Sequence, residues 1–331
     1  MKNRNTIPRV SVLMSVYNTP RDYLKEAIDS VLNQTFDDFE FIIVDDNSNK
    51  ETKDVLRNYT YDNRIILIEN NSNLGLTKNL NKALSLAKGE YVARMDADDI
   101  CDKTRFEKQV SYLDSNESVA MAATYYYLFD SSKKNKHKNE GTSPIEVKTS
   151  LFFSNSSIMH SSVMMRHAIF NTESGFCYDE TYTKTQDFDL WARASHFVKI
   201  AVVPEYLMFY RLSDKQVSRV SSSEQISLKE KVLIRQLYSL MEKVDDKNFK
   251  LHCRFCIGEK VDSSKIVINW AKTLIKKNRD KNYYPDSIFN YFVAKRTLKS
   301  AIKSIRDLAD CFIIIRVLGF YLKSKILFCT R

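Results

Sequence analysis

Three aspartates stand close together at Asp96, Asp98 and Asp99, directly after the apolar segment 91–95. In an extended segment alternate side chains point to the same side, so Asp96 and Asp98 are predicted to converge on one site. Neighbouring carboxylates repel each other unless a positive charge lies between them, and their oxygens suit a hard divalent cation such as Mg²⁺ or Mn²⁺. Such a cation can bridge a diphosphate and neutralise charge on a leaving phosphate. Aspartates are also common in loops, so the motif needs support from its surroundings.

The segments around this cluster alternate between strand and helix patterns. Apolar or β-branched runs predict strands, and apolar residues at helical spacing predict helices between them. The expected strands are 10–15, 39–44, 65–68 and 91–95, and the expected helices are 23–32, 50–58 and 76–87. We expect Asp22 to cap the first helix and Gly89 to end the third in a left-handed conformation. This order predicts an α/β fold with a mostly parallel sheet and helices on both faces.

Ligands of such sheets bind beyond the carboxyl ends of the strands, so the residues that follow each strand are the functional candidates. These residues are Tyr17 and Asn18, Asp45 and Asp46, residues 70–73, and Asp96, Asp98 and Asp99. Acidic and amide side chains dominate three of the four strand ends. The chain contains neither G-x-G-x-x-G nor G-x-x-x-x-G-K-[ST], which excludes the usual dinucleotide and P-loop fingerprints.

The rest of the chain divides into a mixed segment and a helical one. A helix is expected over 104–115, a strand over 119–129 and a charged loop over 131–140, and from Ser223 onward the pattern is helical. Hydrophobic residues make up 44% of the 331 and charged residues 28%, which predicts packed globular structure rather than disorder. No apolar run approaches the roughly 20 residues that a membrane-spanning helix needs, and no secretory signal is visible.

Positive charge is concentrated at the C-terminal end. The net charge is +10, of which residues 1–220 carry −2 and residues 221–331, with 23 basic and 11 acidic side chains, carry +12. Such asymmetry predicts contact with an anionic surface, either phospholipid or nucleic acid, or else a solvated basic face. A helix expected over 293–308 places apolar residues on one face and lysines on another. This suits either a membrane surface or a helix packed on the preceding domain.

Seven segments within residues 1–220 form an ordered set. They are Pro8–Asn18 (PRVSVLMSVYN), Ser30–Phe36 (SVLNQTF), Phe41–Ser48 (FIIVDDNS), Asn73–Gly75 (NLG), Lys88–Asp99 (KGEYVARMDADD), His160–Arg166 (HSSVMMR) and Gln186–Trp191 (QDFDLW). In this order and spacing they resemble family 2 glycosyltransferases, inverting enzymes of the GT-A fold that use nucleotide-sugar donors. Seven ordered matches are far more specific than any one of them. The resemblance does not extend to residues 221–331.

The resemblance implies roles for particular residues. Those implied to bind the nucleotide sugar are Tyr17, Asp45, Asp46, Asn73, Asp96 and Arg211, and those implied to bind Mn²⁺ or Mg²⁺ are Asp98 and Asp96. Tyr17 would flank or stack on the nucleobase. Asp46, together with Asp45, would accept hydrogen bonds from a base such as uracil and from the ribose. Arg211 can contact the diphosphate as a bidentate donor. Ordinary turn chemistry is the alternative for Tyr17 and Asp46.

The resemblance also implies that Asp187 is the general base. An inverting transfer needs a carboxylate that takes the proton of the acceptor hydroxyl as it attacks the anomeric carbon. Gln186 replaces the acid that is usual in the family, which leaves Asp187 as the better base. The alternative is that Asp187 or Asp189 caps a helix near Trp191. His160 and Trp191 fall in segments implied to lie on the acceptor side, although a lone histidine can equally be structural.

One departure from the family pattern concerns the metal site. The family often carries a segment like Y-R-x-H-x-x-Q-x-S, whose histidine can help to bind the metal. Here the corresponding segment is Tyr210–Ser218, and Ser213 stands at the histidine position. The segment therefore lacks the histidine that would bind the metal, and Asp214 is the candidate to replace it as a ligand.

These features together predict an inverting glycosyltransferase. Residues 1–220 form the expected GT-A domain, with a nucleotide-sugar half (1–100) and an acceptor half (101–220), and residues 221–331 form a basic helical region. The expected donor is a nucleotide-diphosphate sugar, with a UDP-sugar favoured, and the acceptor a glycan or a lipid-linked glycan in surface polysaccharide biosynthesis. We expect a cytoplasmic protein that is peripheral to the inner face of the membrane through its basic helices. No nucleic acid partner is expected.

Three alternatives stay open at this point. A sugar nucleotidyltransferase shares the layout, but the segment after the first strand lacks the glycines and arginine of that class. A nucleic-acid-binding protein would use the basic region and would leave the acidic strand ends unexplained. A catalytically inactive partner subunit is compatible with the substitutions at Gln186 and Ser213.

Overall fold

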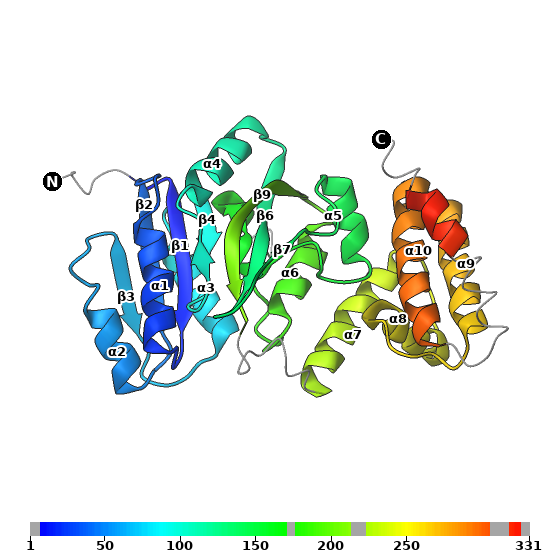
Figure 1. Cartoon of the computed structure of the whole chain (residues 1–331), viewed down its shortest axis with the longest axis horizontal. Helices are drawn as coiled ribbons and strands as arrows, with labels where there is room; N and C mark the ends of the chain where they lie inside the picture. Colours follow the sequence, from blue (N-terminus) through cyan, green and yellow to red (C-terminus); the bar gives the residue numbers. More distant parts are fainter. Residues whose placement is uncertain (1–6, 171–175, 213–222, 305–317, 326–331) are drawn as a thin grey trace. The chain divides into compact units, whose positions relative to one another are not determined.

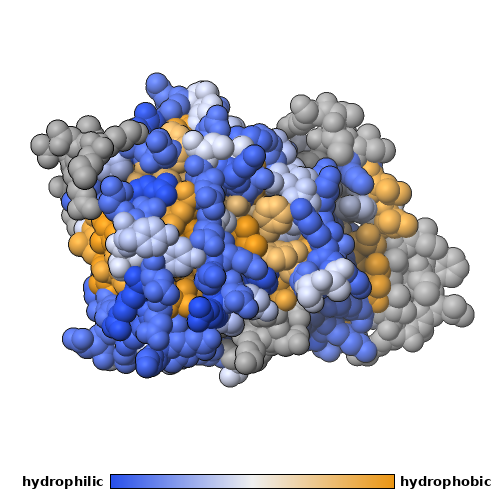
Figure 2. Space-filling view, turned by 60° about the vertical axis from the view of Figure 1, so that its left-hand side comes forward, coloured by the Kyte–Doolittle hydropathy of each residue, from blue (hydrophilic) through white to orange (hydrophobic). Residues whose placement is uncertain are grey.

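The computed structural model describes residues 7–170, 176–212, 223–304 and 318–325 (Figure 1). The chain divides into two compact units, which are residues 1–147 with 156–225 and residues 148–155 with 226–331. Among the described helices, none combines the length and apolar character that a membrane-spanning segment needs. Figure 2 shows hydrophobic residues in separate patches between hydrophilic ones, as is usual for a folded protein surface.

Four parallel strands form the N-terminal part of the first unit. The strands are β1 (Val10–Val16), β2 (Phe39–Asp45), β3 (Ile65–Glu69) and β4 (Tyr91–Arg94), and the helices between them are α1 (Arg21–Leu32), α2 (Lys50–Arg57) and α3 (Leu76–Leu86). The strand order is β3-β2-β1-β4. Val10, Val12 and Met14 of β1 pack with α1 and α2 on one face, and α3 covers the other (Figure 1). The predicted parallel sheet with helices on both faces is confirmed.

Two helix ends differ from the prediction. Pro20 occupies the N-cap of α1, and Asp22 lies in the first turn, where its charge interacts favourably with the helix dipole. Ala87 ends α3, and Gly89 does not have a positive φ. Gly89 is needed for space instead, because a Cβ atom at this position would lie 2.5 Å from Ser11 N in the neighbouring strand.

The sheet continues into a mixed half. Its elements are β5 (Ile100–Cys101), α4 (Arg105–Ser115), β6 (Val119–Phe129), β7 (Lys134–His137), α5 (Pro144–Leu151), η1 (His160–Ser162), β8 (Met164–Arg166), η2 (His167–Phe170), α6 (Gln186–Ala194) and β9 (Lys199–Arg211). β8 lies antiparallel between β4 and β6, and β9 runs parallel to β6. The segment 131–140 is not wholly a loop as expected. It contains β7, because the edge of β6 at residues 126–129 offers hydrogen-bond partners to its backbone.

Helices make up most of the second unit. They are α7 (Ser223–Tyr238), which begins at the boundary, α8 (Asp246–Ile257), α9 (Ser264–Lys281) and α10 (Asp286–Lys303). Aromatic side chains fill the interior: Phe152 contacts Phe289 edge-on, and the ring of Tyr284 stacks on Phe289 at 5.3 Å. The helical pattern predicted from residue 223 onward is confirmed for the described residues.

The apolar face predicted for the helix over 293–308, which began with Val293, Leu298 and Ile302, is only partly buried in α10. Val293 is buried as expected, but Leu298 is partly exposed and Ile302 is 51% exposed. Phe289 and Phe292 are buried in their place. The large aromatic side chains occupy the interior of the unit because their burial removes the most apolar surface from water. The described part of α10 therefore packs within its own unit, and the expected continuation beyond residue 304 lies outside the described residues.

Candidate active site

The carboxyl ends of β1 and β2 lie side by side. Val16 pairs with Asp45 in parallel register, and the backbone N–H of Asp46 donates to the Val16 carbonyl at 2.8 Å. Tyr17 follows β1 directly and is 54% exposed, so its ring is accessible to a ligand. Asn73 is exposed on the loop that precedes α3. The structure therefore brings Tyr17 and the two aspartates to one edge of the sheet.

Asp46 organises the loop that leads into α3. Its carboxylate accepts hydrogen bonds from the backbone N–H groups of Leu74 (2.7 Å) and Gly75 (2.9 Å) and from Asn70 Nδ2 (3.0 Å). Burial by itself would raise the pKa of Asp46, but these hydrogen bonds outweigh it, and the pKa lies below its usual value. Asp46 is therefore a charged anchor for this loop at neutral pH.

Asp45 keeps a carboxylate oxygen for another partner. Its side chain is fully buried, and Oδ1 accepts a hydrogen bond from Ser48 N at 3.1 Å. Oδ2 has no hydrogen-bond partner among the described residues. A buried polar atom without a partner is costly, so this oxygen has unused capacity to accept a hydrogen bond. Of the two adjacent aspartates, Asp45 has the greater hydrogen-bonding capacity left.

The acidic turn after β4 presents two carboxylates and buries a third. Arg94 is 1% exposed, and its Nη1 lies 2.5 Å from Asp96 Oδ1. Asp96 and Asp98 are partly exposed, whereas Asp99 is fully buried and accepts a hydrogen bond from Ser161 Oγ at 2.5 Å. Burial, followed by the charges of Asp96 and Asp98, raises the pKa of Asp99 well above its usual value.

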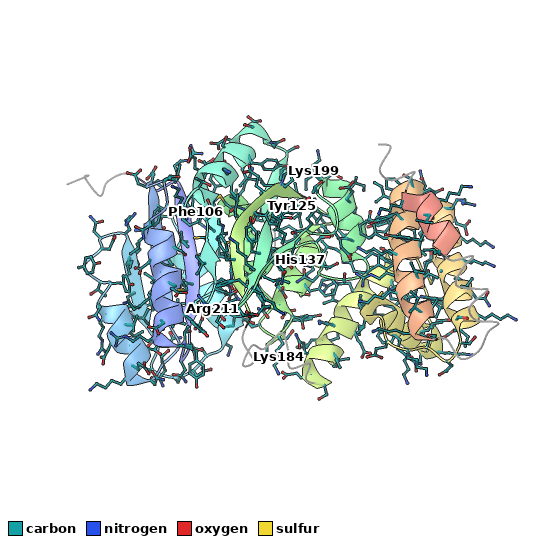
Figure 3. All side chains as sticks on the ribbon, viewed as in Figure 1. Phe106, Tyr125, His137, Lys184, Lys199 and Arg211 are labelled. Atoms are coloured by element: carbon teal, nitrogen blue, oxygen red, sulfur yellow. The ribbon has the colours of Figure 1, made fainter. Side chains whose placement is uncertain are left out.

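Arg211, the last residue of β9, braces this turn (Figure 3). Its backbone N–H donates to Asp99 Oδ1 at 3.0 Å, and its Nε donates to the Asp98 carbonyl at 2.8 Å. Its guanidinium also pairs with Glu26 and lies 4.1 Å from the centroid of the Tyr23 ring. Arg211 therefore holds β9 against the acidic turn, and its contact with a diphosphate stays a prediction.

A cavity of about 420 Å³ brings three of the predicted residues together. Asp96, Asp187 and His160 all line it. The other lining residues are Tyr126, Leu128, Ile158, Met159, Ser161 and Tyr210. Its volume falls in the range of small-molecule sites, and its lining combines apolar side chains with carboxylate, imidazole and hydroxyl groups. A carboxylate on α6 and a carboxylate after β4 thus face the same space.

The start of α6 positions Asp187. Thr185 precedes the helix with φ 65°, a left-handed conformation that β-branched residues rarely adopt. Asp189 is fully buried and pairs with Arg193 Nη2 at 2.8 Å, so it serves the helix itself. Trp191 is also fully buried, and it is not among the residues that line the cavity. Of these side chains, only Asp187 lines the cavity.

His160 is kept neutral at the cavity wall. Burial, followed by the positive charge of Arg94, lowers the pKa of His160 well below its usual value. Its Nε2 lies 2.9 Å from Tyr178 Oη, and its ring meets the Trp191 ring edge-on at 5.9 Å. A neutral imidazole can donate or accept a hydrogen bond without adding positive charge to the cavity. The buried Trp191 ring therefore packs against the His160 ring and helps to fix its orientation.

Sequence reasoning overlooked Arg94, Tyr126 and Tyr210. Arg94 had a usable signal, because an arginine inside an otherwise apolar strand needs a charged partner, and Asp96 lies two residues further on. Tyr126 had none, and Tyr210 appeared only as the first residue of the segment compared with the family pattern. Both tyrosines line the cavity from the adjacent strands β6 and β9, whose pairing joins segments far apart in the chain.

Asp96 and Asp98 are partly exposed on the same turn, and their carboxylate oxygens suit a divalent cation. Mg²⁺ and related ions commonly bind through one or two carboxylates, while substrate phosphates and water complete the shell. Within the described part of the chain, no group of three or more His, Cys, Asp or Glu side chains could hold a metal ion. Within the described residues, an ion at this turn would have these two carboxylates, with diphosphate oxygens and water as further ligands. Ser213 and Asp214, which concern the family histidine position, lie outside the described residues.

Comparison with known proteins relates this arrangement to one family. The family model described as glycosyl transferase family 2 matches residues 11–173. An uncharacterized glycosyltransferase of Methanocaldococcus jannaschii is 37% identical over 224 residues, which are 66% of this chain and 76% of the relative. The Escherichia coli protein WfaP is 36% identical over 119 residues, 36% of this chain and 46% of WfaP. Its name is UDP-Glc:alpha-D-GlcNAc-diphosphoundecaprenol beta-1,3-glucosyltransferase.

A solved structure has the same fold. The S. aureus protein TarS in complex with UDP-GlcNAc is 15% identical, with a TM-score of 0.61 over 89% of this chain and 90% of that chain. At this identity the likeness concerns the fold, and it confirms the predicted GT-A architecture. The archaeal relative is similar enough, over enough of its length, to establish the family. The chain is a glycosyltransferase that belongs to glycosyl transferase family 2.

Proposed function

We propose that this protein transfers a sugar, with inversion, from a nucleotide-diphosphate sugar to a glycan or lipid-linked acceptor in surface polysaccharide assembly. The observation that carries the proposal is the cavity shared by Asp96, Asp187 and His160. The names of two similar proteins favour a UDP-sugar, since WfaP is named for UDP-Glc and TarS is solved with UDP-GlcNAc. The acceptor named for WfaP is a sugar on a lipid diphosphate, which favours a lipid-linked acceptor here.

The nucleotide binds at the ends of β1 and β2. Tyr17 flanks the nucleobase with its exposed ring. Asp45 Oδ2 accepts a hydrogen bond from the base or the ribose, because it is buried and has no other partner among the described residues. Asp46 contributes indirectly: it holds the loop that carries Asn73, through the N–H groups of the next two residues.

Asp96 and Asp98 would hold Mn²⁺ or Mg²⁺ together with the diphosphate. The ion, when bound, neutralises the charge that develops on the departing nucleoside diphosphate. Arg94 orients Asp96 from inside the sheet, because its Nη1 contacts one oxygen of that carboxylate at 2.5 Å. The other oxygen of Asp96 can then point toward the ligand.

Asp187 acts as the general base. It removes the proton from the acceptor hydroxyl while that oxygen forms a bond to the anomeric carbon and the bond to the diphosphate breaks. Attack from the face opposite the nucleotide inverts the anomeric configuration. His160 stays neutral and hydrogen-bonds the acceptor, oriented by its contact with Tyr178.

The second unit provides the proposed contact with the inner face of the membrane. Lys265, Lys272 and Lys276 are exposed at helical spacing on α9, in a region with a net charge of +12. Lysines near an anionic leaflet are attracted by its surface potential. Because α10 packs inside this unit, substitution of these lysines is a cleaner test than truncation of the C-terminal residues.

A nucleotide-binding assay can distinguish residues of the proposed donor site from the proposed general base. We expect one of UDP, GDP, CDP and dTDP to raise the melting temperature in the presence of Mn²⁺, with UDP the first candidate. Asp45→Asn and Asp98→Asn should weaken this shift. Asp187→Asn should keep the shift and lower transfer from the matching donor sugar by about 10²- to 10⁴-fold.

Asp38→Asn is the matched control, because Asp38 is exposed and lies outside the proposed site. It should change neither binding nor transfer. If no nucleotide stabilises the protein, the proposed donor site is wrong. If Asp187→Asn keeps normal transfer, another residue is the base.

A further inference from the structure

The strands β6, β7 and β9 carry a surface that the proposed function does not use. Parallel register places Tyr125 beside Tyr206 and Tyr127 beside Phe209, so these four rings share one face of the ribbon. All four are partly exposed. Three exposed lysines on and beside β7 accompany them. We define the aromatic–lysine face as Tyr125, Tyr127, Tyr206, Phe209, Lys134, Lys136 and Lys138.

The lysines of this face lie over its rings. Lys134 Nζ is 4.0 Å from the centroid of Tyr127 and 4.3 Å from that of Phe209. Lys136 Nζ lies 5.2 Å from the centroid of Tyr206. Lys138 Nζ lies 6.0 Å from the centroid of the Tyr125 ring. Figure 3 labels Tyr125 on the ribbon. The ammonium groups of these exposed lysines thus lie over the faces of the aromatic rings, in cation–π contacts at the protein surface.

Positive charge predominates on and around the face. Residues 130–140 contain four lysines and two acidic residues, Asp130 and Glu140. Of the neighbouring acids, Glu205 pairs with Lys108 and Glu140 accepts a hydrogen bond from Ser156. The face therefore combines a local positive charge with partly exposed aromatic rings.

The same strands also line the active-site cavity. Side chains alternate along β6, so Tyr126 and Leu128 line the cavity while Tyr125 and Tyr127 belong to the aromatic–lysine face. Among the strands that the structure describes, β7 pairs with β6 alone, so it forms an edge of the sheet here. A partner that binds this face is therefore separated from the proposed acceptor site by the thickness of one sheet.

We propose that the aromatic–lysine face docks the catalytic unit on an anionic phospholipid surface. Tyrosine and lysine are the side chains favoured at the boundary between lipid and water. Single-stranded nucleic acid is less suited, because bases need open ring faces for stacking, and Lys134 occupies those of Tyr127 and Phe209. The proposal extends the membrane partner proposed above, but it concerns the first unit and does not depend on the second.

Vesicle binding of the full chain tests the proposal. The variant Lys134→Ser/Lys136→Ser/Lys138→Ser is compared with the control Lys25→Ser/Lys50→Ser/Lys103→Ser, which removes the same charge from exposed positions elsewhere on the first unit. The probes are vesicles of phosphatidylcholine with phosphatidylglycerol and vesicles of phosphatidylcholine alone. Each lysine near an anionic surface contributes about fivefold to the partition coefficient, so the test variant should lose about a hundredfold and the control much less.

Each result of the vesicle-binding experiment either supports or overturns the proposed docking on phospholipid. Selective loss of binding to the anionic vesicles by the test variant supports the proposal. Equal binding by the test variant and the control overturns it, and the lysines then serve only to protect an edge strand from pairing with other chains. Loss of binding to a single-stranded RNA probe with unchanged vesicle binding overturns it in favour of nucleic acid. Failure here leaves the nucleotide-binding results untouched, and a Lys265→Ser/Lys272→Ser/Lys276→Ser variant tests the second unit separately.

Discussion

Replacement of Asp46 by asparagine should release the loop before α3. In the wild type one buried carboxylate accepts three hydrogen bonds, from Leu74 N, Gly75 N and Asn70 Nδ2. A hydrogen bond to a charged group contributes about 1.5–3 kcal/mol. Asparagine keeps one acceptor oxygen and turns an N–H donor toward another donor, so about two of these bonds are weakened. Leu74 is 43% exposed, so water can replace part of each lost hydrogen bond, and the lower end of this range, about 1.5 kcal/mol for each bond, applies. We therefore expect the two weakened bonds to lower the local stability of the loop by about 3 kcal/mol.

Hydrogen exchange measures this loss where it occurs. A local cost of about 3 kcal/mol corresponds to about a hundredfold faster exchange of the amides of Leu74 and Gly75. Asp45→Asn is the internal comparison, because Asp45 Oδ2 has no partner to lose among the described residues and Oδ1 is retained. It should leave exchange in this loop unchanged while it weakens nucleotide binding. Asp38→Asn controls for the loss of a charge.

The pH dependence has a defined sign. The folded-state pKa of Asp46 lies below its usual value, so its stabilising effect is complete above the usual carboxyl range and is lost as the pH falls through the lowered pKa. Protection of the loop should therefore fade in acid in the wild type and not in Asp46→Asn. Exchange at Leu74 and Gly75 within twofold of the wild type in Asp46→Asn would refute the assignment of Asp46 as the anchor of the loop.

Two further substitutions test the packing of each unit. Gly89→Ala should destabilise the first unit by about 1–3 kcal/mol in urea unfolding, because the added methyl group would lie 2.5 Å from Ser11 N; a neutral effect would contradict this close approach. Burial lowers the pKa of His252 to about 3, so the second unit should lose about 1.4 kcal/mol of stability for each pH unit below the usual histidine value near 6.5. His252→Gln should flatten this dependence, measured by hydrogen exchange of α8, and an unchanged slope would assign it to another group.

The edge of the sheet at which we propose that the nucleotide binds was predictable from the sequence. Tyr17, Asp45 and Asp96 each follow an apolar run, and the alternation of strands with helices implies a parallel sheet whose carboxyl ends lie together. This inference needs only local periodicity and one rule of topology. The same locality explains why the ordered motifs identified the family before any tertiary contact was known.

The division of labour between Asp45 and Asp46 was not predictable. The two residues are adjacent, of the same type and both buried, so no pattern along the chain distinguishes them. They differ because the loop of Leu74 and Gly75 folds back onto Asp46 alone. Long-range contact decided which carboxylate is already occupied and which has an oxygen left for a ligand.

The cavity and the aromatic–lysine face both depend on contacts between segments that lie far apart in the chain. The sequence by itself determined the family, the α/β order, the identity of the acidic strand ends and the basic character of the C-terminal region. Only the tertiary structure brought Asp187, Asp96 and Tyr126 to the wall of one cavity, and made a strand of four residues in a charged segment expected to be a loop. These placements depend on hydrogen bonds and packing between segments far apart in the chain, and such contacts leave no local signature in the order of the residues.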